Sequence, residues 1–124
     1  SVLEGLDAGI SIDNMTFSSD GNAGVRRKNP ETGEDTYRIA PLDKNLEQTI
    51  RLITDGGLTP DKAFRLITVN PARNMKLNGK GKVAVGADAD LTLFDDAWNL
   101  QCVIARGHMM MRDGAIIKKG NFEM

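Results

Sequence analysis

The sequence is poor in two residue types that often carry chemistry: among 124 residues it has one cysteine and one histidine. Cys102 has no second thiol with which to form an internal disulfide or a zinc ribbon. It lies in an apolar run, which predicts a buried small hydrophobic residue rather than a nucleophile. His108 has no second potential ligand nearby, so we expect a packed or edge histidine without a metal role. A chain without disulfides is typical of a reducing, cytoplasmic setting.

An excess of charge of one sign is also missing. The sequence has 16 basic and 17 acidic residues, a formal net charge of −1. Nucleic-acid and anionic-membrane partners favour clustered Lys and Arg, so this balance supports neither kind of partner. No apolar run approaches the roughly 18–20 residues of a membrane span, and no charged-then-apolar stretch resembles a signal peptide. The chain opens at Ser1 in the middle of a helical pattern, and we therefore expect a fragment of a longer protein.

Helix signals recur along the first part of the chain. Each combines apolar residues spaced three to four apart with a capping residue, a proline or a terminal glycine. They predict a helix that ends at Gly9 and helices that start at Asp43, Thr59 and Asn70. Between the first two, residues 15–18 are expected to form a short strand. Residues 21–35 are expected to be a polar loop, longer than ordinary connections and therefore functional or mobile.

After residue 78 the pattern changes to short apolar runs separated by turns, which is typical of strands. The expected strands cover residues 83–85, 91–94, 102–105, 109–111 and 115–117. Asp113-Gly114 predicts a hairpin turn, because both residue types tolerate the positive φ that such turns require. The methionines at 109–111 are expected to fill the core as part of a strand. The two halves of the chain do not resemble one compact barrel or sandwich.

An acidic residue, Asp20, follows the strand expected at residues 15–18, and a glycine comes next. In α/β barrels, catalytic residues lie at the C-terminal ends of strands. Gly21 is expected to let the chain turn sharply away and to leave the carboxylate exposed. The alternative is an ordinary turn, since Ser-Asp-Gly-Asn is also common turn chemistry.

Residues 79–95, GKGKVAVGADADLTLFD, resemble a segment of the amidohydrolase superfamily, with which its members return to a small β-sandwich after their barrel. Residues 68–73, TVNPAR, resemble the start of the helix before that segment. Residues 103–107 and 111–114 resemble the closing strands. Together these segments identify the superfamily and say nothing about the substrate.

Three further segments resemble the isoaspartyl dipeptidases in particular: TFSSDGN at residues 16–22, IAPL at 39–42 and KGNFE at 119–123. The resemblance implies an α/β fold: the C-terminal part of a metal-dependent (β/α)8 amidohydrolase barrel, with its last strand and closing helices, plus part of the small β-sandwich domain. Residues 1–78 are then the C-terminal end of the TIM-barrel domain, and residues 79–124 are a segment of the β-sandwich domain. The implied activity of the complete enzyme is hydrolysis of β-aspartyl (isoaspartyl) dipeptides.

The resemblance also implies a role for Asp20. In the family this carboxylate contacts a centre of two zinc ions, accepts a proton from the bridging hydroxide and passes it to the leaving amine. A metal-bound water has a pKa near 7, so a neighbouring carboxylate is a competent acceptor. The family's HxH pair, carboxylated lysine and two further histidines lie on earlier strands. We therefore expect this chain alone to be inactive, to hold no zinc, and to be marginally stable or a homo-oligomer because its apolar faces lack partners.

Asn22 and Gly24 are the candidate substrate-binding residues. The family usually carries a serine four residues after the catalytic aspartate, where it helps to hold the dipeptide, whereas this chain has Gly24. This departure leaves open another amidohydrolase, such as an N-acyl amino acid deacylase or a dihydroorotase-like enzyme, and also a non-catalytic structural module. Asn22 is alternatively a turn residue. Arg26, Arg27 and Arg38 either pair with a substrate carboxylate or are solvated loop charges.

Overall fold

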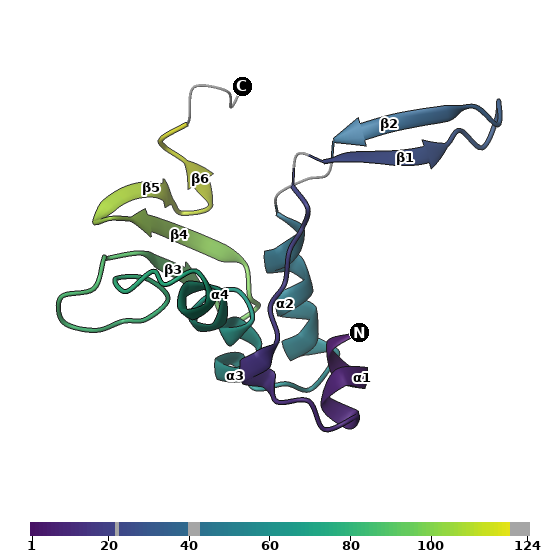
Figure 1. Ribbon diagram of the computed structural model, residues 1–124. Helices are drawn as coiled ribbons and strands as arrows, with labels where there is room; N and C mark the ends of the chain where they lie inside the picture. Colours follow the sequence, from purple (N-terminus) through teal and green to yellow (C-terminus); the bar gives the residue numbers. More distant parts are fainter. Residues whose placement is uncertain (22, 40–42, 120–124) are drawn as a thin grey trace. The chain divides into compact units, whose positions relative to one another are not determined.

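The computed structural model describes residues 1–21, 23–39 and 43–119 (Figure 1). The chain divides into two compact units, an N-terminal unit of Ser1–Ile67 and a C-terminal unit of Thr68–Met124. The boundary expected between residues 78 and 79 concerns the complete protein and stays a prediction. Within the described ranges, every helix is too short or too polar to cross a lipid bilayer.

The N-terminal unit contains helices whose ends follow the local signals. Helix α1 (Val2–Asp7) is followed by Gly9, whose φ of 85° gives the left-handed turn expected after a helix. A 3-10 turn, η1 (Ile12–Asn14), comes next. Helix α2 (Lys44–Thr54) begins directly after Asp43, as predicted, although the Asp43 side chain makes no capping hydrogen bond. Helix α3 (Pro60–Arg65) has Thr59 at its N-cap and proline in its first turn, which confirms that prediction.

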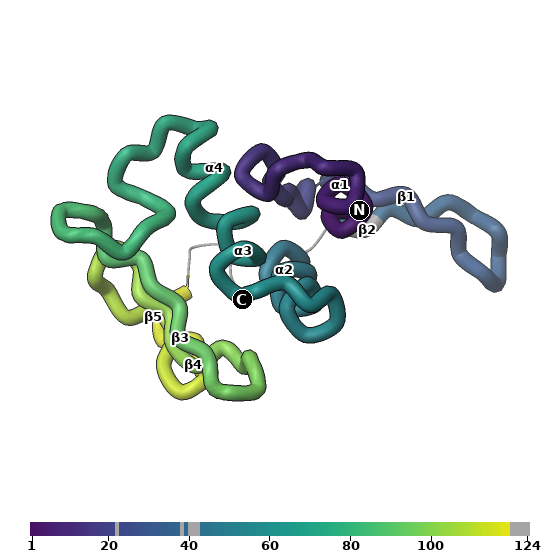
Figure 2. The backbone as a smooth tube through the Cα atoms, turned by 90° about the horizontal axis from the view of Figure 1, so that it is seen from below, coloured from purple at the N-terminus to yellow at the C-terminus, as the bar shows by residue number. Residues whose placement is uncertain are grey.

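The core of the N-terminal unit lies where α2 contacts α3 (Figure 2). Ala63 and Leu66 are fully buried there, and Thr49 of α2 is buried with its hydroxyl donating to the carbonyl of Asn45 at 2.8 Å. That internal bond lets a polar side chain be buried without losing a hydrogen bond. The chain turns between the helices at Gly57, whose φ is 70°.

Two predictions for the N-terminal unit are wrong. Residues 15–18 form no strand in this chain, because no strand in the described part of the chain pairs with them. The expected polar loop at residues 21–35 is largely a β-hairpin, in which β1 (Gly24–Lys28) pairs antiparallel with β2 (Asp35–Ile39) (Figure 1). The loop was expected because the segment is polar and shows no periodicity, whereas cross-strand hydrogen bonds do not require an apolar pattern.

The C-terminal unit begins with helix α4 (Val69–Asn74), which has Thr68 at its N-cap. The helix therefore starts before the expected Asn70-Pro71, and Asn70 lies within its first turn, fully buried. A four-stranded antiparallel sheet follows in the order β3-β4-β5-β6. Its strands are β3 (Leu91–Phe94), β4 (Leu100–Ala105), β5 (His108–Arg112) and β6 (Ala115–Ile116).

Left-handed residues make the tight turns of this sheet. Arg106 and Gly107, between β4 and β5, have φ values of 48° and 78°. Asp113 and Gly114, between β5 and β6, have φ values of 50° and 75°, which confirms the predicted hairpin turn. The strand expected at residues 83–85 is wrong, since this segment lies in a loop with Val83 86% exposed.

Candidate active site

The segment that carries Asp20 is attached to the C-terminal end of α3. The N–H of Phe17 donates to the carbonyl of Leu66 at 3.2 Å. Arg65, the residue before Leu66, donates from Nη1 to Asp13 Oδ1 at 2.8 Å. This hydrogen bond connects η1 to the same helix. The hydrogen bond that Arg65 donates to Asp13, with the nearby charge of Asp61, holds the pKa of Arg65 above its ordinary value. These contacts position the backbone that leads into Asp20.

Asp20 sits at a sharp turn with its side chain exposed. Its φ is 49°, so the left-handed residue of the turn is Asp20 itself, and the sharp turn expected at Gly21 already begins there. Its N–H donates to Ser18 Oγ at 3.2 Å, and its carbonyl accepts from the N–H of Ala23 at 3.0 Å. The carboxylate makes no hydrogen bond or ion pair with any residue that the structure describes. It is therefore open to a substrate or a metal ion, and the turn geometry agrees equally with a turn-forming aspartate.

The other candidate substrate residues lie on the hairpin that follows. Gly24 begins β1 and pairs with Ile39. A Cβ at this position would lie 3.8 Å from Cδ1 of Tyr37, an ordinary contact, so a side chain fits there. Arg26 forms an ion pair with Asp35, whereas Arg27 is exposed on β1. Asn22 and the side chain of Arg38 lie outside what the structure describes.

Metal ligands are sparse in the described part of the chain. No group of three or more His, Cys, Asp or Glu side chains is placed to hold a metal ion there. His108 is exposed at the start of β5, and Cys102 is half-buried in β4 rather than fully buried as expected. Asp20 alone offers one carboxylate, so these residues do not by themselves fit a binuclear metal centre.

In the C-terminal unit, a lysine and two aspartates form a charged cluster that the sequence did not predict. Lys80 Nζ lies 2.8 Å from Asp88 and 2.5 Å from Asp90. Asp90 Oδ1 also accepts from the N–H of Arg106 at 2.7 Å, which fixes the β4–β5 turn. The acidic residues of the GADAD motif are therefore scaffold residues in this chain. Their only signal in the sequence is the motif itself.

Asp95 plays a similar structural role between β3 and β4. Its carboxylate accepts from the N–H groups of Ala97 and Asn99 and from the side chains of Asn99 and Gln101. The bonds from Asn99 and its neighbours hold the pKa of Asp95 below its ordinary value. The hydrogen bond from Lys80, followed by that from Arg106, lowers the pKa of Asp90 in the same way.

These two carboxylates predict a loss of stability in acid. The pKa of Asp90 in the folded chain lies below its ordinary value of 3.8, so the unfolded chain binds the proton more readily. The stabilisation is complete above about pH 4 and is lost as the pH falls through the lowered pKa. We expect the urea midpoint, followed by Trp98 fluorescence, to fall below about pH 4. In Asp90→Asn that fall should be smaller but should not disappear, because the pKa values of Asp95, Glu4 and Glu47 are also lowered by their hydrogen bonds. An unchanged fall would contradict the assignment.

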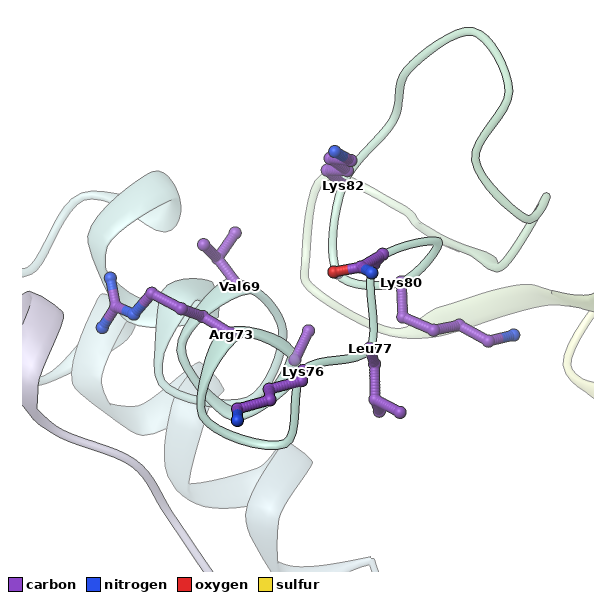
Figure 3. Close-up of a pocket in the computed structure, with 9 residues that line it drawn as sticks. Val69, Arg73, Lys76, Leu77, Lys80 and Lys82 are labelled. Carbon is purple, nitrogen blue, oxygen red and sulfur yellow. The ribbon is translucent and has the colours of Figure 1, made fainter.

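A cavity of about 300 Å³ lies beside α4, lined by nine residues between Val69 and Lys82 (Figure 3). It has four basic neighbours, Arg73, Lys76, Lys80 and Lys82. Figure 3 shows that Arg73 and Lys76 extend away from Lys80, and Lys80 is already paired with Asp88 and Asp90. The charged groups do not converge on one point, so this cavity is a weaker candidate site than the exposed carboxylate of Asp20.

Comparison with known proteins gives a family match over nearly the whole chain. A family model described as "Amidohydrolase family" matches residues 1–118. Among solved structures, the chain is similar to a β-aspartyl dipeptidase from Fervidobacterium islandicum AW-1, solved in complex with a β-Asp-Leu dipeptide. That similarity has a TM-score of 0.78 and 35% sequence identity, and it covers 98% of this chain and 32% of that chain.

Two other comparisons match proteins with different names. An adenine deaminase from Jannaschia sp. (strain CCS1) is 36% identical over 87 residues, which are 68% of this chain and 13% of that protein. The N-acetylglucosamine-6-phosphate deacetylase from Pasteurella multocida has a TM-score of 0.65 at 17% identity, covering 86% of this chain and 32% of that chain, a likeness of fold alone. The chain thus spans a small part of the length of the proteins that it matches.

Proposed function

This chain belongs to the amidohydrolase family, and we propose that it is part of a metal-dependent hydrolase that cleaves β-aspartyl dipeptides. The observation that carries the proposal is the similarity to the β-aspartyl dipeptidase of Fervidobacterium islandicum AW-1 over 98% of this chain. The mixed helix and strand architecture agrees with a part of an amidohydrolase fold. In the complete protein we place residues 15–18 in the last barrel strand, where neighbouring strands supply the pairing that this chain lacks.

Asp20 is the residue to which we assign the proton transfer. Hydrolysis requires water to attack the amide carbonyl, the C–N bond to break, and one proton of that water to reach the leaving amine. The Asp20 carboxylate is exposed and unengaged by other described residues, so it can accept the proton and then return it to the amine.

We propose that the complete enzyme uses two zinc ions, which make water more acidic and so a better nucleophile at neutral pH. The described residues of this chain do not fit such a centre alone, so its other ligands belong to the remainder of the protein. We assign no step to the metals from this chain's residues. The contribution of this chain is the carboxylate at the turn.

The test is hydrolysis of β-aspartyl-leucine by the complete, zinc-loaded protein, followed by the release of free leucine. We expect turnover that is lost after the metal is removed and restored when zinc is added back. The same preparation should be tested with N-acetylated amino acids and dihydroorotate. A folded, zinc-loaded protein that does not release leucine contradicts the dipeptidase assignment.

Adenine deamination is a second candidate, favoured by the 36% identity to the Jannaschia adenine deaminase over 87 residues. Both reactions add water to a carbon bonded to nitrogen, so the same proton acceptor serves either. The two are separated by supplying adenine and β-aspartyl-leucine to the same enzyme. Ammonia release from adenine without leucine release would replace the first proposal with the second.

Gly24 offers a way to test where a dipeptide binds. A side chain at this position meets only Cδ1 of Tyr37, at 3.8 Å, so Gly24→Ser should fold normally. If the dipeptide lies beside Gly24, the new hydroxyl supplies one hydrogen bond, and KM for β-aspartyl-leucine should fall by about 3–10-fold with kcat little changed. Gly24→Ala, which has the same Cβ and no hydroxyl, is the control. Equal kinetics for the two variants would place the substrate elsewhere.

A further inference from the structure

The hairpin of β1 and β2 is exposed on both faces. Every side chain of β1 is exposed, and on β2 the exposed fractions of Tyr37 and Ile39 are 73% and 74%. A two-stranded hairpin is marginally stable by itself in water, and stable sheets have three or more strands or a covering layer. The hairpin therefore has both the backbone groups and the apolar side chains to accept a further strand.

The register shows which backbone groups are unpaired. The N–H of Asn29 donates to the carbonyl of Glu34 at 2.8 Å, so this pair next to the turn is hydrogen-bonded. Along an antiparallel ladder, hydrogen-bonded residue pairs alternate with pairs that are not hydrogen-bonded. Counting from the Asn29–Glu34 pair, Arg27–Thr36 is a hydrogen-bonded pair and Arg26–Tyr37 is a non-hydrogen-bonded pair. The N–H and C=O groups of Asp35, Tyr37 and Ile39 therefore point away from β1. We call this row of groups the β2 edge.

The opposite edge, on β1, is protected by charge. Arg26, Arg27 and Lys28 are three consecutive cations on that strand. Antiparallel pairing of two copies of β1 about Arg26 or Arg27 places like charges directly opposite each other, which is destabilising. Positive side chains on an edge strand are a common means of preventing edge-to-edge association. The β1 edge is therefore a poor docking site for a second copy of the chain.

The β2 edge, in contrast, is complementary to itself. Two copies of β2 paired antiparallel about Tyr37 bring Tyr37 opposite Tyr37 and Asp35 opposite Ile39. No like charges face each other in this register, and the outward backbone groups of all three residues find partners. On one face, the Tyr37 and Ile39 side chains of both copies come together and cover apolar surface that is exposed in the single chain.

We propose that the β2 edge binds the β2 edge of a second copy of this chain, giving a four-stranded antiparallel sheet with a two-fold axis at Tyr37. Such an interface uses the same surface on both copies and closes as a dimer. Pairing of β2 with β1 of a second copy would leave a free edge at each end and would grow into open assemblies. The proposal rests on the hairpin alone and is independent of the role of Asp20.

Cross-linking tests the predicted two-fold axis. In the hydrogen-bonded pair at the axis the two Tyr37 Cα atoms lie about 5.5 Å apart, within the range that a disulfide spans. In a Cys102→Ser background, Tyr37→Cys should give mostly covalent dimer on mild oxidation at micromolar concentration. Arg26→Cys, the cross-strand neighbour on the β1 edge, is the matched control and should give little. Equal cross-linking of both variants, or of neither, would overturn the proposed axis.

Charge reversal tests the register without a covalent bond. Ile39→Asp places a carboxylate opposite Asp35 of the second copy, and sedimentation velocity should show a dissociation constant raised about tenfold or more. Ile39→Lys places an opposite charge against the same Asp35 and is the matched control, which should keep the dimer, because it leaves the Arg26–Asp35 ion pair in place. A wild-type chain that is monomeric, or that forms open assemblies, contradicts the proposal. So does a dimer that Ile39→Asp and Ile39→Lys weaken equally or not at all.

Discussion

Asp20→Asn in the complete enzyme should lower kcat for β-aspartyl-leucine by about 10²–10⁴-fold, the usual contribution of a positioned general base. The substitution keeps the size of the side chain and removes its ability to accept a proton at neutral pH. Because the carboxylate makes no hydrogen bond or ion pair within the described part of the chain, its loss should leave the fold intact. The measurement is leucine release under saturating substrate, with circular dichroism as the check on folding.

Asp96→Asn is the matched control for this experiment. Asp96 is also an exposed aspartate, in the connection between β3 and β4, and the same substitution there should leave kcat unchanged. The zinc content of both variants should be measured as well, because a carboxylate that touches the metal centre can alter its occupancy. An Asp20→Asn enzyme with normal zinc content and more than a third of the wild-type kcat would refute the proton-transfer role.

Gly81→Ala should destabilise the C-terminal unit by about 2–4 kcal/mol. Gly81 has a φ of 77°, which an alanine adopts only with strain. A Cβ there would also lie 2.7 Å from the carbonyl oxygen of Thr68 and 2.8 Å from Cβ of Ala72. Since both neighbours belong to α4 or its N-cap, the loop must move away from the helix. Urea unfolding of the chain, followed by the fluorescence of Trp98, measures the effect.

Gly86→Ala separates the two causes. Gly86 has a similar φ of 83°, but no atom of the described residues beyond its chain neighbours lies within 4 Å of the position of a Cβ. Its substitution therefore carries the backbone strain alone, about 1–2 kcal/mol. The difference between the two variants isolates the close approach of the loop to α4. If both variants lose the same stability, that close approach contributes nothing.

The helix and turn predictions succeeded where the signal is local. Thr59-Pro60 starts α3, Gly9 ends α1, and Asp113-Gly114 forms the β5–β6 turn. At each of these positions a proline, a capping residue or a positive φ constrains the backbone within a few residues. The start of helix α4 was misplaced by two residues, because Thr68 takes the N-cap position that was expected for Asn70.

The strand predictions failed where strand formation depends on pairing with another segment. Residues 15–18 and 83–85 have strand-like patterns, yet neither forms a strand in this chain, because a strand requires a neighbour to pair with. The β1–β2 hairpin was missed for the opposite reason: its residues pair with each other despite a polar pattern. Asp20 and the exposure of its carboxylate were predicted from the sequence, whereas its left-handed backbone was not, because the turn was expected at Gly21.

The sequence by itself determined the amidohydrolase resemblance, the starts of α2 and α3, the end of α1, the β5–β6 turn and the exposure of Asp20. Only the tertiary structure decided which distant groups meet: Phe17 with Leu66, Asp13 with Arg65, and Lys80 with Asp90. The physical reason is the range of the forces involved. Backbone conformation depends on neighbours in the sequence, whereas hydrogen-bond partners and ion pairs depend on where the folded chain returns close to itself.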